Sequence, residues 1–180
     1  MNTIGTLADA QRDMRSGYLA GAPGVLASAL AWLVAAIVVL AASPRAGVLA
    51  LFIGGMGIFP VGVAIAKMFG RSGTHTPGNP LAPLALESTV LMMLCLPLAF
   101  VVSLYRVEYF FPAMLLVIGG RYLLFATLYG LRIYWALGGT LAVAAVTLGM
   151  TSAPTFAGAM TGGLIELSFA VFMLVAGRKW

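Results

Sequence analysis

The sequence predicts an all-α integral membrane protein with six transmembrane helices. Of its 180 residues, 62% are hydrophobic and only 8% are charged, and the mean hydropathy is +1.05. A soluble domain carries roughly a quarter charged residues and at most about half apolar ones, so this chain has too little polar surface to cover itself in water. Its apolar runs are long and continuous, which excludes a β-barrel, whose strands need about ten residues of alternating polarity.

The transmembrane segments follow from length. A helix needs about 20 mostly apolar residues to cross a hydrocarbon core about 30 Å thick. Six segments qualify, at residues 20–42, 46–69, 81–104, 110–129, 133–150 and 155–176. Short turns join them in pairs, so we expect one transmembrane domain over residues 20–180, built from three consecutive helical hairpins.

Residues 1–19 form a separate N-terminal segment. Thr6 and Asp9 have the spacing of a helix capping box. Mainly apolar residues follow at helical spacing on one side of the segment, namely Ile4, Leu7, Gln11, Met14 and Tyr18. This pattern predicts a short amphipathic helix at the membrane surface, with a frayed terminus as the alternative.

The basic residues predict the orientation, because cytoplasmic loops are enriched in Lys and Arg. With the N-terminus inside, two basic residues lie outside, Arg45 and Arg106. The inside set is larger: Arg12, Arg15, Lys67, Arg71, Arg132, Arg178 and Lys179. We therefore expect both termini in the cytoplasm. The net charge of +5 is scattered over helix ends, a pattern that predicts topology and no nucleic-acid partner.

Double glycines occur in the second helix of each hairpin, at 54–55, 119–120 and 162–163. Their similar positions suggest an internal repeat of three hairpins around a common centre. Glycine makes up 22 of the 180 residues, so such pairs also arise by chance. Small residues allow helices to approach closely in lipid, and we expect the glycines to serve packing rather than function.

Arg121 and Glu166 are predicted to lie near the middle of their spans, at similar depth. Ionisable residues inside a membrane are costly and usually face protein or water, so we expect the two to form an ion pair. The pair would be either a substrate, ion or proton site in a central cavity, or a structural salt bridge that fixes helix register. Tyr122 and Phe125 lie beside this face and could line the same pocket.

Other charged and aromatic residues are expected near the membrane surfaces. Glu87 could pair with Lys67 at the inner interface or reach water alone. The loop over residues 70–80 could hold a phosphate or lipid headgroup through Arg71, with His75 nearby, although a mobile connector is favoured. Interfacial belts are expected from two aromatic groups: Tyr129, Tyr134 and Trp135 with Arg132, and Tyr105, Tyr109, Phe110 and Phe111.

The residues that the sequence lacks exclude several functional classes. No Asp follows Asp13, and the single Cys95 and single His75 cannot build a typical zinc site. We expect no cofactor or metal, and nothing favours an enzyme. A small transporter or channel fits the midplane charges best, with a homodimer left open as its working unit. A structural or assembly protein and a lipid-modifying enzyme that uses Glu87, Glu166 or His75 remain alternatives.

The chain resembles an uncharacterised bacterial family of small multi-span membrane proteins, known as a domain of unknown function. The resemblance covers nearly all of the sequence. It rests on DMRSGY at 13–18 leading into GAPG at 21–24, GNPL at 78–81 with Glu87, and YRVEYFFP at 105–112 through GGRY at 119–122. It implies a bacterial inner-membrane setting and carries over no site residue.

Overall fold

The computed structural model describes residues 5–177, which form helices and no strand. In chain order these are α1 (Leu7–Tyr18), the 3-10 turn η1 (Leu19–Gly21), α2 (Ala22–Ala41), α3 (Pro44–Met68), α4 (Ala82–Tyr105), η2 (Val107–Tyr109), α5 (Phe110–Tyr129), α6 (Ile133–Met150) and α7 (Thr155–Ala176). Six stretches are long and apolar enough to cross a membrane. The all-α, multi-pass prediction is confirmed. Ile4, Arg178 and Lys179 lie outside the described residues.

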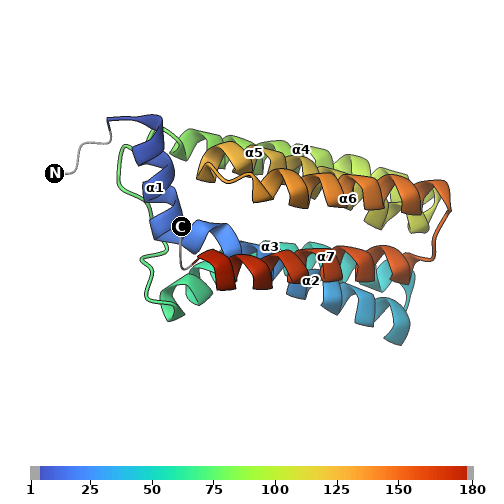
Figure 1. The fold of residues 1–180 in the computed structure, drawn as a ribbon. Coiled ribbons are helices and arrows are strands. Elements are labelled where there is room, and N and C mark those ends of the chain that lie inside the picture. Colours follow the sequence, from blue (N-terminus) through green and yellow to red (C-terminus); the bar gives the residue numbers. More distant parts are fainter. Residues whose placement is uncertain (1–4, 178–180) are drawn as a thin grey trace.

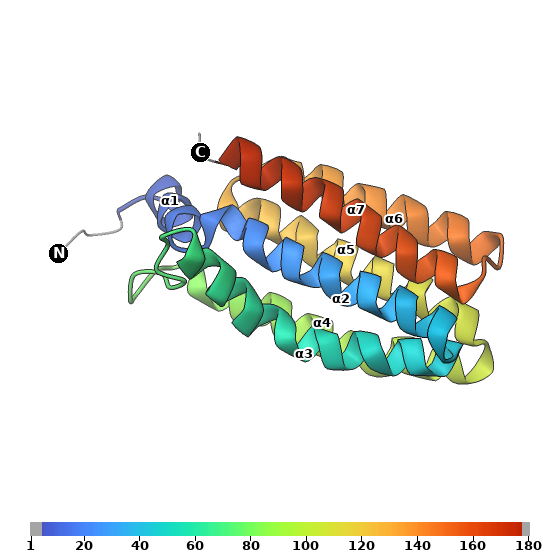
Figure 2. The ribbon, with the colours of Figure 1, turned by 90° about the horizontal axis from the view of Figure 1, so that it is seen from below.

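The long helices form two layers (Figures 1 and 2). In one layer α2 lies between α3 and α7, and in the other α5 lies between α4 and α6. The short α1 crosses one end of the bundle, where α7 also ends (Figure 1); we call this the α1 end. The connections from α3 to α4 and from α6 to α7 each link one layer to the other.

The hairpins expected from the sequence are present in chain order but are not equivalent. The first two keep both helices within one layer, whereas α6 and α7 belong to different layers. α7 packs mainly on α2, and α6 packs mainly on α5. The helices therefore do not surround a common centre as three like units.

Glycines set the close approach of helices within a layer. A Cβ at Gly138 would lie 2.6 Å from the carbonyl oxygen of Gly119, and a Cβ at Gly54 would lie 2.9 Å from the Cβ atom of Ala31. Gly55 and Gly120, the second members of their pairs, face open space. The packing role expected for the glycines is thus confirmed for the first member of each pair.

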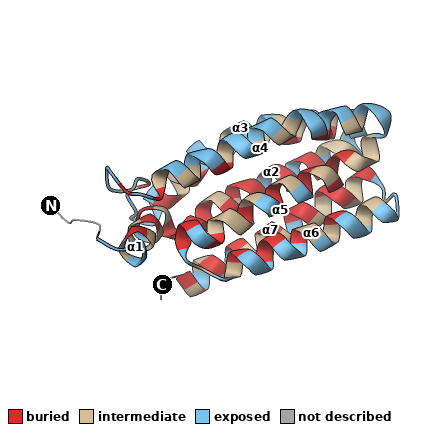
Figure 3. Cartoon of the chain, turned by 90° about the horizontal axis from the view of Figure 1, so that it is seen from above, coloured by how far each residue is buried: buried red, intermediate tan, exposed pale blue. Residues whose placement is uncertain are grey.

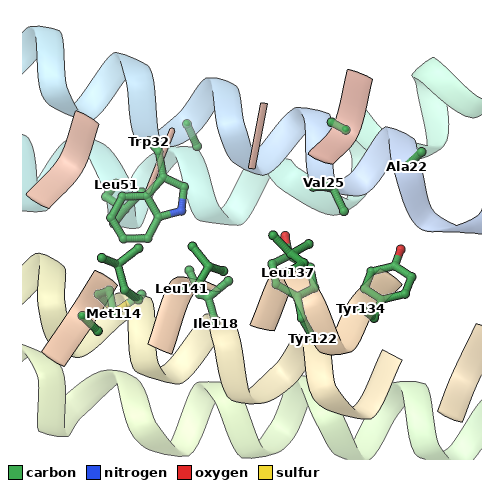
Figure 4. Packing of buried hydrophobic residues seen from close by; sticks show 14 of the residues in the cluster. Ala22, Val25, Trp32, Leu51, Met114, Ile118, Tyr122, Tyr134, Leu137 and Leu141 are labelled. Carbon is green, nitrogen blue, oxygen red and sulfur yellow. The ribbon is translucent and has the colours of Figure 1, made fainter. Parts of the chain in front are cut away.

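Large side chains fill the space between the layers, as Figure 4 shows. Trp32 from α2 meets Phe111 from α5, with ring centroids 5.8 Å apart. Leu115, Leu137 and Leu141 are fully buried in the same region. Burial is concentrated on α2 and α5, and the outer faces of α3 and α4 are largely exposed (Figure 3). Those exposed faces are apolar, as lipid contact requires.

The junction between α1 and α2 is strained. Leu19 and Ala20 have φ angles of 49° and 54°, followed by Gly21 at 81°, and a left-handed conformation costs a residue with a side chain about 1–2 kcal/mol. The Tyr134 hydroxyl donates a hydrogen bond of 2.7 Å to the Ala20 carbonyl and holds this turn. The turn directs α1 across the bundle end, so the first spanning helix begins at Ala22 rather than at residue 20.

Gly138→Ala is expected to destabilise the protein by about 1–3 kcal/mol, because its new methyl group would collide with the backbone of α5. Gly139→Ala is the matched control, since nothing lies within 4 Å of a Cβ there. That control should be neutral or slightly stabilising, because alanine favours a helix over glycine. Thermal unfolding in detergent, followed by circular dichroism, measures both. Equal effects of the two substitutions would contradict the close α5–α6 contact.

Candidate functional site

Glu166 is the one acidic residue inside the helical core of residues 5–177. It lies in the middle of α7 and is 0% exposed. The Tyr122 hydroxyl, from α5 in the opposite layer, donates a hydrogen bond of 3.0 Å to its Oε1 atom. Ser28 and Trp32 of α2 lie beside the same carboxylate. Both layers therefore contribute to the surroundings of this acid.

The carboxylate of Glu166 is only half satisfied. Among the described residues, no hydrogen bond within 3.5 Å reaches its Oε2 atom or the Nε1 atom of Trp32, although the Ser28 and Trp32 side chains lie close enough to interact weakly with the carboxylate. A buried polar atom without a partner costs about 1–3 kcal/mol, and a lone ionised carboxylate in apolar surroundings costs far more. Packing alone does not account for an acid in this position, which makes Glu166 the first candidate for function.

The ion pair expected between Arg121 and Glu166 is wrong. Arg121 points toward α4, where its guanidinium donates to Thr89 Oγ1 at 3.0 Å and to Met92 Sδ at 3.3 Å. It also lies over the ring of Phe125, with its Cζ atom 5.1 Å from the centroid. Arg121 and Glu166 lie at similar depth. Because neighbouring residues of a helix point in different directions, however, the Arg121 side chain lies on the outer side of α5 while the Tyr122 side chain faces inward.

Tyr122 and Phe125 belong to an aromatic cluster with Tyr129 and Tyr134. Neighbouring rings lie 5.5 to 5.9 Å apart, from centroid to centroid. The cluster runs from Glu166 toward the α1 end between the layers. The interfacial belt expected for Tyr129 and Tyr134 is therefore wrong, because both side chains are buried.

The second expected belt is wrong in part, because some of its residues are buried and others are exposed. Phe110 and Phe111 are fully buried core residues, whereas Tyr105 is 84% exposed. The first turn of α5 directs both phenylalanines between the layers, toward Phe52 and Trp32. Trp135, expected in the first belt, is exposed. Spacing along one helix did not reveal which aromatic residues face a second layer.

The remaining predicted site residues lie apart from Glu166. Glu87 and Lys67 are both exposed, and no ion pair joins them in the described part of the chain. Arg71 is exposed at the α1 end. His75 is partly buried, with its Nδ1 atom 3.0 Å from the Tyr18 hydroxyl. These residues do not form one interfacial cleft.

A polar network that the sequence analysis missed joins α1 to the loop before α4. Asp13 accepts hydrogen bonds from the backbone N–H of Thr76 at 2.9 Å, the Thr76 hydroxyl at 2.8 Å and the Asn79 amide at 2.7 Å. Burial alone would raise the pKa of Asp13, but these bonds outweigh it and hold that pKa below 3.8. Asp13 and Asn79 come from two of the strings that carried the family resemblance.

Further contacts fix the same end. Gln11 donates to the Thr127 carbonyl at 2.8 Å, and Arg15 donates to that of Tyr129 at 2.6 Å. The N–H of Gly73 donates to the carbonyl of Gly17 at 3.0 Å. The mobile connector expected over residues 70–80 is therefore wrong, and so is the frayed alternative for α1. Thr6 is confirmed as the N-cap of α1, since its hydroxyl accepts a 3.2 Å bond from the backbone N–H of Asp9. The Asp9 carboxylate bonds to the Thr6 hydroxyl at 2.7 Å rather than to the Thr6 backbone N–H of a full capping box.

Two cavities lie at the ends of the bundle. One, of about 60 Å³, is at the α1 end and is lined by Arg12, Arg15 and Arg71 among others. The other, of about 390 Å³, is at the opposite end, beside Pro44, Glu108 and the first turn of α7. Neither is lined by Glu166. Within residues 5–177, no cluster of three or more His, Cys, Asp or Glu side chains offers a metal site.

The hydrogen bond between Tyr122 and Glu166 is expected to produce a coupling energy of about 1–3 kcal/mol. A double-mutant cycle with Tyr122→Phe and Glu166→Leu, measured by chemical denaturation in mixed micelles, tests this, because each substitution removes the bond. The matched cycle of Arg121→Met with Glu166→Leu should show a smaller coupling, because those two side chains are not paired. A larger coupling for Arg121 than for Tyr122 would indicate a direct ion pair between Arg121 and Glu166 and would contradict the structure.

Asp13→Asn is expected to loosen the loop over residues 70–80, because a neutral amide is a weaker acceptor than a carboxylate. A carboxyl with a lowered folded-state pKa stabilises the fold above its unfolded pKa and loses that contribution as the pH falls through the folded value. The substitution imitates the low-pH state at neutral pH. Hydrogen exchange at Gly73 and Thr76 should quicken about tenfold.

Asp9→Asn is the control for this experiment, since the Asp9 carboxylate contacts only Arg12 and the Thr6 hydroxyl at the start of α1 and makes no bond to the loop. Exchange in the loop should be unchanged there. Slow exchange retained in Asp13→Asn would show that the loop is held by other contacts.

Comparison with known proteins identifies a family for the chain but no activity. No curated protein and no solved structure matches the chain. A family model described as a family of unknown function, DUF7010, matches residues 7–176, from the start of α1 to the end of α7. The chain therefore belongs to this family of unknown function, DUF7010.

Proposed function

We propose that the protein is a small transporter or channel-like membrane protein that conducts protons, with its site closed in this conformation, in which Glu166 carries the proton. The observation that carries this proposal is the Oε2 atom of Glu166, which is buried and unpartnered between the two layers. An acid inside a membrane is a candidate functional group, because its burial is costly. Binding and release of a proton by this carboxyl would account for its position inside the membrane.

The surroundings of Glu166 suit a group that changes charge. Tyr122 donates to Oε1, and this bond serves a carboxylate and a carboxylic acid alike. The free Oε2 atom is where a proton would bind. Arg121 lies near enough to act on Glu166 through its charge without binding it. A direct ion pair would hold the acid in its ionised form, so the separation of these two charges favours a proton cycle.

Alternating access would require the two layers to part at Glu166. The layers meet through side chains, whereas the helices within a layer are in close backbone contact. Separation between layers therefore breaks fewer contacts than separation within one. The cavity of about 390 Å³ begins at Thr155, about 16 Å from Glu166 along α7 at 1.5 Å per residue. It is the natural entrance at that end.

The distribution of basic residues supports a cytoplasmic location for the α1 end. Arg12, Arg15 and Arg71 lie there, whereas Arg45 and Arg106 lie at the opposite end of the bundle. Such an asymmetry favours the positive-inside orientation, and the bacterial setting that the family resemblance implies would place the protein in the inner membrane. The proposed entrance near Thr155 would then face the periplasm.

A structural or assembly role is the second candidate, and the tight packing beside Glu166 favours it. A Cβ at Gly162 would lie 2.8 Å from the Trp32 ring and 2.9 Å from Leu115. A dry contact of this kind fixes helix positions without any transport. On this view the Tyr122–Glu166 bond serves only to set the register between the layers.

Glu166→Gln separates the two candidates, because glutamine can accept the Tyr122 hydrogen bond but cannot exchange a proton. Purified protein is reconstituted into liposomes with a trapped pH-sensitive dye, and a potassium gradient with valinomycin drives proton entry. We expect proton flux above that of empty liposomes, and its loss in Glu166→Gln.

Glu87→Gln is the matched control, since Glu87 is an exposed acid on α4; its flux should equal that of the wild type. Thermal unfolding confirms that both variants are folded. Flux that is equal in wild type and Glu166→Gln would exclude Glu166 as the proton carrier. No flux in any sample, with Glu166→Gln less stable than Glu87→Gln, would favour the structural role.

A further inference from the structure

Three arginines from two separate segments converge on the small cavity at the α1 end. Arg12 and Arg15 come from α1, and Arg71 comes from the loop that follows α3. Ser16 and the strained backbone at Leu19 and Ala20 complete most of its wall. The residues 12, 15 and 16 share one side of α1, so the helix and the loop close around a single basic pocket.

The neighbouring acids neutralise only part of the positive charge of this pocket, because they form an ion pair with Arg12 and with neither Arg15 nor Arg71 among the described residues. Asp13 is on another side of α1 and is engaged by Thr76 and Asn79. Asp9 forms an exposed ion pair with Arg12 at 3.1 Å and also accepts a hydrogen bond from the Thr6 hydroxyl. Burial and, secondly, the like charge of Arg12 lower the pKa of Arg15. Such repulsion costs stability unless an anion relieves it.

The donors that remain free suit an oxygen-rich anion. Arg15 uses Nη1 for the Tyr129 carbonyl at 2.6 Å, and its other N–H groups remain. The structure contains no partner for the Arg71 guanidinium among the described residues. A planar guanidinium binds two oxygens of a phosphate at once. A volume of about 60 Å³ exceeds the roughly 10–15 Å³ that one water needs and accommodates a tetrahedral group.

We propose that the pocket formed by Arg12, Arg15 and Arg71 binds a phosphate group, presented either by an anionic lipid headgroup or by a free phosphate. The geometry of α1 supports a lipid source in particular, because this helix lies across the bundle end where headgroups would meet it. His75 is not part of this site, since it bonds to Tyr18 instead. The proposal is independent of Glu166, and either one can fail without the other.

The test uses the full chain in a neutral detergent. Binding is measured in two arms, by isothermal titration of inorganic phosphate against sodium chloride at equal ionic strength, and by native mass spectrometry with phosphatidylglycerol against phosphatidylcholine. We expect saturable binding in at least one arm. Binding of inorganic phosphate identifies a soluble anion, and selective retention of phosphatidylglycerol alone identifies a headgroup. Absence of selective binding in both arms overturns the proposal.

The variants assign the binding to this pocket. Arg12→Gln combined with Arg71→Gln should weaken it at least tenfold, by the loss of about two charge-assisted contacts. Arg132→Gln is the matched control, because Arg132 is exposed at the same end but does not line the cavity; its affinity should change less than about twofold. Equal loss in the control and the double variant would show diffuse charge attraction and overturn the site. Circular dichroism verifies that each variant is folded.

Discussion

The structure depends on a division between small residues within each helical layer and large residues between the layers. In lipid, helices associate through close packing rather than through the hydrophobic effect. Gly138 and Gly119 allow α5 and α6 to meet backbone to backbone, and Trp32 and Phe111 then fill the gap that separates the layers. This division explains why α2 and α5, at the middle of each layer, are the most buried helices.

The position of Glu166 follows from the same division. α7 lies against α2 because Gly162 and Gly163 leave room for Trp32 and Leu33, and this contact turns Glu166 toward the opposite layer. There it meets the Tyr122 hydroxyl. The layer interface is therefore largely apolar and aromatic, and it carries the Glu166 carboxyl near its middle. Any rearrangement that parts the layers must change the environment of that group.

The α1 end follows a different physical rule. Its contacts are hydrogen bonds to carboxylate and carbonyl oxygens, made by Asp13, Gln11 and Arg15. Burial and, secondly, the charge of Asp13 raise the pKa of Tyr18, so its hydroxyl stays protonated and can donate to His75. A helix and a loop that would each be poorly ordered alone are thus held together, and this contact brings Arg12, Arg15 and Arg71 to the wall of one pocket.

Composition and hydropathy by themselves determined the six spanning segments, the all-α class and the short helix that precedes them, because apolar length is a local property. The N-cap at Thr6 and the packing role of Gly119 also followed from local rules. Tertiary structure alone decided which side chains meet. Arg121 and Glu166 lie at like depth, yet helical phase separates them, since consecutive residues point about 100° apart and one step exchanges Arg121 for Tyr122. Asp13 and Asn79 are far apart in sequence, and only the fold of the loop onto α1 brings them within 2.7 Å.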